Sequence, residues 1–225
     1  FLLGFLKKNR LQLFLRATLI VLFLWTYAFI TGMSPSVVRS ALMFSFVAIG
    51  TSLERKSQIY NTIFMSAFFM LLIQPNFIYN IGFQLSYAAV LSIVIFQKPF
   101  AALLPVRNKI LRWLRDLLSV SIAAQIGTLP FTLYYFQQFP NYFLLTNLVA
   151  IPLSTIVIYL AITLLATSFI PVVATFVAIL LKWSLVALNF SIVEIHHLPF
   201  SVSELTLNFA QLLALVGAIT FISLY

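Results

Sequence analysis

Eight apolar runs, each about long enough to cross a lipid bilayer, dominate this sequence. A helix needs about 20 mostly apolar residues to span the hydrocarbon core. The runs lie near residues 11–31, 36–52, 58–74, 81–97, 117–137, 143–168, 172–197 and 207–225. Hydrophobic residues make up 63% of the chain and charged residues 8%, which leaves too little polar surface to cover a soluble globule. The sequence therefore predicts an all-α, polytopic transmembrane bundle of about eight spans.

Turn-forming residues separate the runs, at 32–35, 74–76, 139–141, 168–171 and 197–199. Pro130 and Pro152 fall inside runs, where each removes a backbone hydrogen bond, so we expect interrupted or kinked helices there. We find no internal repeat, and the simplest organisation is one transmembrane domain over residues 1–225. The chain opens without methionine and stops in an apolar run, so we expect a fragment of a longer protein.

Basic residues fall in alternate connections between the runs. They precede the first run, separate the second from the third, and separate the fourth from the fifth: Lys7, Lys8 and Arg10; Arg55 and Lys56; Lys98, Arg107, Lys109, Arg112 and Arg115. The connections at 32–35, 75–80 and 138–142 carry no charge. By the positive-inside rule this pattern places residues 7–10 and the 98–116 loop in the cytoplasm. The rule also accounts for much of the net charge of +9.

The 98–116 loop is predicted to hold a short amphipathic helix. Ile110, Leu111 and Leu114 fall together, while Lys109 and Arg112 fall opposite. This arrangement favours an interfacial anchor on anionic lipid over a contact with nucleic acid.

Arg39 is the first polar residue that hydrocarbon should exclude. Ser34 and Pro35 are typical of a helix start, which puts Arg39 just over one turn inside the membrane. An arginine within a span costs about 2.5–3.5 kcal/mol unless it finds an anion or water. Glu194, near the outer end of the seventh run, is the best protein partner by this topology. A structural ion pair and a site that meets phosphate both remain open.

The fourth run begins with a second polar group. Gly82 and Ser86 form a small-xxx-small face that lets another helix approach closely, and Gln84 lies on a neighbouring face. Buried helix packing is one interpretation, and a hydrated channel wall is the other.

Two further groups lie beside the prolines inside runs. One polar stripe follows the fifth run through Ser121, Gln125, Thr128 and Thr132. Asn147 lies next to Leu148. Pro152 has no backbone N–H, so the Leu148 carbonyl loses its helical hydrogen-bond donor. Amides beside broken helices suggest irregular backbone that lines a cavity.

The seventh run carries a fourth pattern. Thr175, Lys182, Asn189 and His196 recur every seven residues and so share one helix face. Such a stripe is hard to explain against lipid. The alternative is that the run's boundaries are misplaced and Lys182 lies outside the membrane.

Several kinds of chemistry have no signature here. The chain has no cysteine, and it has no H-E-x-x-H, G-x-S-x-G, P-loop or G-x-G-x-x-G motif. Glu194, His196 and His197 are more typical of a helix end than of a zinc site. We therefore expect no enzymatic activity, no metal and no cofactor. The aromatic residues between 131 and 143 are either an interfacial belt or a stacking platform for bases.

Four clusters, taken in order, resemble the competence domain of the ComEC family, the inner-membrane DNA channels of bacterial natural transformation. The matching segments are 32–43, Pro75 with 82–86, 123–130 and 147–153. The resemblance implies that one DNA strand crosses the inner membrane into the cytoplasm while its complement is degraded. It also implies an OB-like domain before this region and a β-lactamase-like domain, the suspected nuclease, after it.

With the resemblance, the polar residues become candidates for a DNA path. The predicted lining residues are Arg39, Gln84, Ser86, Ser121, Gln125, Thr128 and Asn147. The basic 98–116 loop is predicted to receive the strand or its cytoplasmic motor. Two alternatives remain: a small-molecule or lipid transporter with a midplane pocket, and a structural scaffold for flanking domains.

Overall fold

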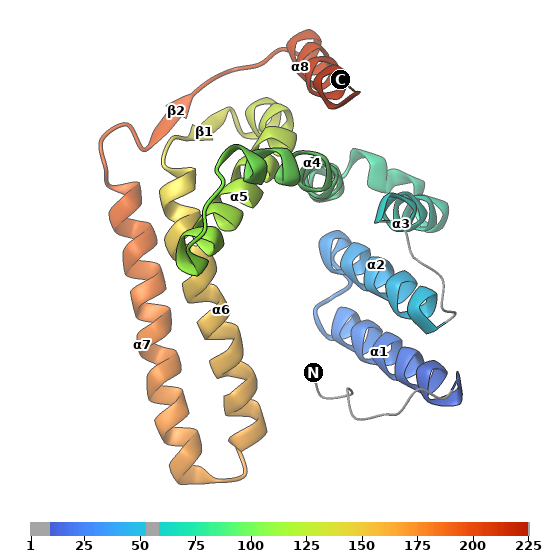
Figure 1. The fold of residues 1–225 in the computed structure, drawn as a ribbon, viewed down its shortest axis with the longest axis vertical. Helices are drawn as coiled ribbons and strands as arrows, with labels where there is room; N and C mark the ends of the chain where they lie inside the picture. The colour runs from blue at the N-terminus through green and yellow to red at the C-terminus, as the bar shows by residue number, and fades with distance from the viewer. Residues whose placement is uncertain (1–9, 53–58, 225) are drawn as a thin grey trace. The chain divides into compact units, whose positions relative to one another are not determined.

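The computed structural model describes residues 10–52 and 59–224 of the chain. Within them lie eight α-helices: α1 (Arg10–Ile30), α2 (Pro35–Ser52), α3 (Ile59–Ile73), α4 (Ile81–Leu103), α5 (Lys109–Phe136), α6 (Phe143–Thr167), α7 (Pro171–His196) and α8 (Phe209–Leu224) (Figure 1). A 3₁₀-helix, η1 (Pro75–Tyr79), and two short strands, β1 (Gln138–Pro140) and β2 (Val202–Glu204), complete the described elements. The all-α prediction is confirmed.

Five of these helices are long and apolar enough to cross a membrane: α1, over Leu13–Ile30, and α4 to α7. The apolar parts of α2, α3 and α8 are shorter. At 1.5 Å per residue, the 15 residues of α3 extend only about 23 Å, whereas the hydrocarbon core is about 30 Å thick. The chain is a multi-pass membrane protein, and its shorter helices need flanking residues or a locally thinner bilayer to span.

The chain divides into two compact units, residues 1–94 and 95–225, and α4 runs through the boundary. The prediction of a single transmembrane domain concerns the chain as a whole and stays a prediction.

In the first unit, α1 and α2 pack as a hairpin. The turn places Gly32 at φ 78° and Met33 at φ 54°. Glycine adopts this left-handed region without strain, which explains the residue at the first of these positions. The core of the unit joins α2, α3 and α4 through Val38, Leu42, Ile63, Met70, Phe83 and Tyr87.

In the second unit, α6 and α7 lie side by side as a long hairpin, and α5 packs against both α6 and α8 (Figure 1). The antiparallel strands β1 and β2 pair Gln138 with Glu204 and Pro140 with Val202. This small sheet ties the α5–α6 connection to the α7–α8 connection. The sequence predicted a turn at 139–141 and no element at 202–204, because a three-residue strand is too short to show a period of two.

Side chains reinforce the same junction. The Asn141 amide donates from Nδ2 to the Phe200 carbonyl at 2.6 Å and to Ser203 Oγ at 2.8 Å. The Tyr142 hydroxyl donates to the Pro199 carbonyl at 3.1 Å. The two connections therefore form one ordered structure at one end of the unit.

The helix predicted within the 98–116 loop is present, but it is continuous with the fifth run. Residues 109–116 are the first turns of α5, and α4 continues to Leu103. Asn108 caps the start of α5 by accepting a hydrogen bond from Ile110 N at 3.0 Å through its side chain. Only residues 104–108 are non-helical.

The helices continue through their prolines. Pro130 lies inside α5 and Pro152 inside α6, and the sequence analysis did not anticipate that Pro99 lies inside α4. Helical backbone thus persists on both sides of each proline, and the kinks stay predictions.

Candidate functional site

Four residues in the first unit form what we call the Arg39 cluster: Arg39, Ser66 and Tyr87 through their side chains, and Ser86 through its backbone carbonyl. Arg39 Nη1 donates to the Ser86 carbonyl at 3.2 Å, and the guanidinium carbon lies 5.8 Å from the Tyr87 ring centroid. The Tyr87 hydroxyl is 2.9 Å from Ser66 Oγ, with both residues buried. Two predicted site residues, Arg39 and Ser86, are thus brought together across α2 and α4.

The guanidinium of Arg39 is only partly satisfied. It carries five N–H donors; Nη1 has the Ser86 carbonyl, whereas Nε is buried with no hydrogen-bond partner in the described part of the chain. A carbonyl and an aromatic ring stabilise a cation but do not neutralise it. An anion near the guanidinium would therefore still be stabilising. Its predicted pairing with Glu194, a residue of the other unit, stays a prediction.

Gln84 has a structural contact of its own. Its Nε2 donates to the Ile78 carbonyl at 2.8 Å, which ties the first turn of α4 to η1. Asn80 adds to this junction by accepting from Phe83 N through Oδ1 at 3.1 Å. Gln84 is half-buried, and its predicted place along a DNA path stays a prediction.

The predicted stripe of α5 lies in the second unit. Ser121 is buried, with no hydrogen-bond partner for its Oγ among the described residues. Gln125 and Thr128 are half-buried, and Thr128 Oγ1 donates back to the Ala124 carbonyl at 3.0 Å. Asn147 is half-buried on α6, the helix that packs on α5. The second unit therefore holds hydroxyls and amides within its apolar helices.

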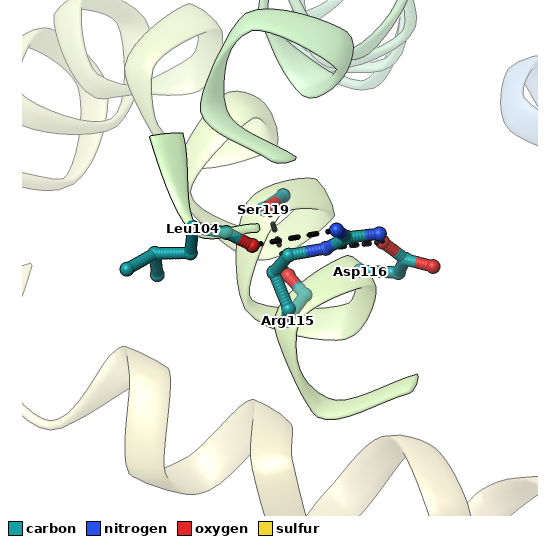
Figure 2. Close-up of polar contacts among 4 residues, drawn as sticks. All are labelled: Leu104, Arg115, Asp116 and Ser119. Atoms are coloured by element: carbon teal, nitrogen blue, oxygen red, sulfur yellow. Dashed lines mark hydrogen bonds and ion pairs between the residues drawn. The ribbon is translucent and has the colours of Figure 1, made fainter. Parts of the chain in front are cut away.

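The basic α4–α5 connection separates into two kinds of cation. Arg115 is engaged: Nη2 and Nε contact Asp116 Oδ1 at 2.7 and 3.0 Å, and Nη1 donates to the Leu104 carbonyl at 3.4 Å (Figure 2). Ser119 Oγ donates to the Arg115 carbonyl at 2.7 Å. The other four predicted patch residues are exposed: Lys98, Arg107, Lys109 and Arg112. Arg115 thus holds the connection in place, and the exposed four provide its accessible charge.

Metal ligands do not gather in the described ranges. Over residues 10–52 and 59–224, no group of three or more His, Cys, Asp or Glu side chains lies together. The His196 and His197 rings are 6.2 Å apart on the last turn of α7 and the residue after it. The described residues therefore offer no set to which a metal could be assigned.

Sequence reasoning missed three polar residues that the structure uses. Ser66 was passed over although it interrupts an apolar run in α3, and that interruption was the available signal. Asn141 was taken as a turn residue and Tyr142 as one of the aromatic residues of 131–143, and nothing local indicates that they bond to residues about 60 positions later.

Together these observations define a class: multi-pass membrane proteins whose apolar helices carry isolated hydroxyl, amide and cationic side chains. The family described as "Competence protein" matches residues 1–225, and the chain belongs to that family. ComE operon protein 3 of Bacillus subtilis (strain 168) is 33% identical over 137 residues. That match covers 61% of this chain and 17% of the relative's length. No solved structure shows a significant match.

Proposed function

We propose that this chain is the channel domain through which single-stranded DNA crosses the cytoplasmic membrane during natural transformation. Membership in the competence family over the full length supports a role in DNA uptake. The chain spans well under a fifth of the curated relative that it matches, so the activity of the whole protein is part of the proposal.

The observation that carries the proposal is the incompletely satisfied Arg39. A guanidinium within an apolar helix, with one hydrogen bond among the described residues for its five N–H donors, suits an anion that arrives and leaves. Guanidinium geometry fits phosphate, as it fits carboxylate, often through two N–H donors at once. A permanent carboxylate partner would hold the arginine as structure, whereas the described contacts leave donors for a passing backbone.

The neutral polar residues also suit a channel for DNA. A channel must bind its substrate strongly enough to admit it and weakly enough to release it. Phosphate contacts dominate affinity for DNA and would hold the strand if cations were dense. Gln84, Ser86, Ser121, Gln125, Thr128 and Asn147 supply weak contacts without regard to base sequence, and we assign them to the lining of the path.

The length of α5 supports an orientation. Its 28 residues extend about 42 Å, close to the full bilayer thickness of about 40–45 Å with headgroups. One end carries the exposed cations and the other leads into the β1–β2 sheet. If spans alternate, the α5–α6 and α7–α8 connections emerge on one side, as their shared sheet requires. We therefore propose that the 98–116 segment is cytoplasmic and the sheet extracytoplasmic.

The proposal assigns no catalysis to this chain. Degradation of the complementary strand would belong to a flanking β-lactamase-like domain, and DNA would first meet an OB-like domain outside the membrane. The exposed residues Lys98, Arg107, Lys109 and Arg112 would receive the emerging strand or the motor that pulls it.

A lipid transporter remains the second candidate because of one groove. Helices α1 and α2 border a space of about 530 Å³ that is lined by apolar residues and by Arg16. A volume of a few hundred Å³ suits a small ligand, and an acyl chain with an anionic headgroup matches the lining. Contact with ordinary bilayer lipid accounts for the same groove.

The test uses the full-length protein in a transformable host. Internalised, nuclease-protected DNA is scored separately from recombination in a gene deletion and in Arg39→Ala and Gln125→Leu variants. We expect the deletion to abolish internalisation and both variants to reduce it, with Gln138→Leu, an exposed position in β1, as the matched control. Normal internalisation in the deletion strain would refute the proposal, and lipid flipping lost in the deletion would favour the second candidate.

A further inference from the structure

Helix α7 presents one face to α6 in a regular heptad pattern. Its residues that are not exposed are Ala174, Val177, Leu181, Ser184, Leu188, Ser191 and Ile195. Their spacing alternates between three and four residues, which is the a/d pattern of a left-handed coiled coil. The hairpin in Figure 1 is therefore packed along this single line of residues.

The polar stripe predicted on α7 lies away from that line. Thr175, Lys182, Asn189 and His196 each follow an a-type residue by one position, so all four occupy heptad position b. All four are exposed. Because the stripe repeats every seven residues, it keeps a constant position relative to the α6 contact along the whole helix.

Lys182 is the residue of this stripe whose charge no nearby acid on the helix offsets. It is the twelfth residue of a 26-residue apolar helix, so about 17 Å of helix precede it and about 21 Å follow. Both lengths exceed half the hydrocarbon thickness of about 30 Å, too far for the ammonium to reach either interface easily. Lys182 has no ion pair among the described residues. The nearest acid on the helix, Glu194, is about 18 Å further along.

Aromatic side chains form a second row on the same helix. Phe176, Trp183 and Phe190 also repeat every seven residues, each directly after a residue of the polar stripe. They are between 63% and 66% exposed, so no other helix of the second unit packs over them. Successive residues are about 100° apart around the axis. The outward surface thus carries a polar row and an aromatic row, with a line of Ile and Val between them.

We propose that this outward surface of α7 is a binding surface for the single strand in transit. Lys182 contacts a phosphate, Thr175, Asn189 and His196 supply weaker polar contacts, and Trp183 with its neighbouring rings stacks on bases. Proteins that bind single strands without sequence preference combine these two features, a cation for the backbone and aromatic rings for the bases. The inference rests on the proposed function. It extends the path of the DNA strand to α7, which lies outside the four segments that resemble the ComEC family.

Other occupants fit the surface less well. A second copy docked through this face, related by an axis normal to the membrane, would place Lys182 against its own copy. A lipid headgroup lies at the interface, whereas Lys182 lies at the middle of the helix. A helix that carries a carboxylate would satisfy Lys182 but would not require the aromatic row.

The test combines substitution with crosslinking in the full-length protein. Lys182→Gln removes the charge and Lys182→Arg keeps it, so we expect internalised DNA to fall about tenfold or more in the first, as for loss of one charge-assisted contact, and to be largely retained in the second. A photoreactive residue at position 183 should crosslink to a labelled strand stalled in transit. The same residue at Tyr159, exposed on α6, is the matched control and should not.

Two results would overturn the inference. One is normal internalisation by Lys182→Gln at normal protein level. The other is crosslinking from position 183 to lipid or protein alone while transport proceeds, a result that does not depend on whether Lys182→Gln inserts. If the deletion strain has lost uptake, either result overturns this inference alone. Normal uptake in the deletion strain overturns the proposed function.

Discussion

Replacing Arg39 by methionine should change function far more than stability. Methionine fills a similar volume without charge, so the variant removes both the cost of the buried cation and the contacts that offset it. Arginine within a span costs about 2.5–3.5 kcal/mol. Against this stand one interhelical hydrogen bond to Ser86, worth about 0.6–1.7 kcal/mol, and the Tyr87 ring at 5.8 Å, worth about 0.5–2 kcal/mol.

These opposing terms are nearly equal. We therefore expect Arg39→Met to shift the free energy of unfolding by less than about 2 kcal/mol in either direction. DNA internalisation should fall about tenfold or more, because a charge-assisted contact with phosphate is worth about 1.5–3 kcal/mol. Arginine would then be retained for function at no gain in stability, as is common at functional sites.

The assay pairs two measurements on the same variants. Unfolding is followed by detergent titration of the purified full-length protein, and internalisation is scored in cells at matched protein level. Arg16→Met, on α1 of the same unit, is the control and should leave internalisation unchanged. A destabilisation of about 3–5 kcal/mol, the usual result of breaking a buried ion pair, would show that Arg39 is structural and refute the reasoning.

Three further predictions concern contacts elsewhere in the chain. A double-mutant cycle of Ser66→Ala and Tyr87→Phe should give a coupling of about 0.6–1.7 kcal/mol in detergent unfolding, and zero coupling would contradict the 2.9 Å hydrogen bond. Asn141→Ala removes the two side-chain donations of Asn141 to the α7–α8 connection, so limited proteolysis should cut near the β1–β2 sheet faster than in the parent protein, and an unchanged rate would contradict that role. Lys109→Gln with Arg112→Gln should reduce enrichment of anionic over zwitterionic lipid around the purified protein, with unchanged enrichment as the opposing result.

Hydrophobic runs determine which segments become helices, and this part of the fold was predictable. All eight runs correspond to helices in the described residues, because an apolar segment in lipid must satisfy its backbone internally. The ends of the helices were harder to predict from the sequence. Lys98 and Lys109 fall outside the predicted spans because they are charged, yet α4 and α5 extend to include them, since charge costs little in the interfacial region.

Contacts between distant segments could not be predicted from the sequence. The β1–β2 sheet depends on a pairing between residues about 60 positions apart, for which neither strand carries a local signal. At the candidate site, the exclusion of cations from lipid singled out Arg39, but whether its partner would be a carboxylate or a carbonyl depended on which helices meet. The bond to Ser86 follows from the packing of α2 with α4.

The central claim is that water and a DNA strand reach polar side chains at the middle of the spans, and one measurement addresses it directly. The chain contains no cysteine, so single cysteines can be placed at Gln125 and Asn147 in a full-length protein that is otherwise cysteine-free. The account predicts that a membrane-impermeant thiol reagent labels both positions and that a strand stalled in transit slows the labelling. Absence of labelling at both positions in a transport-competent protein, or labelling that DNA leaves unchanged, would contradict it.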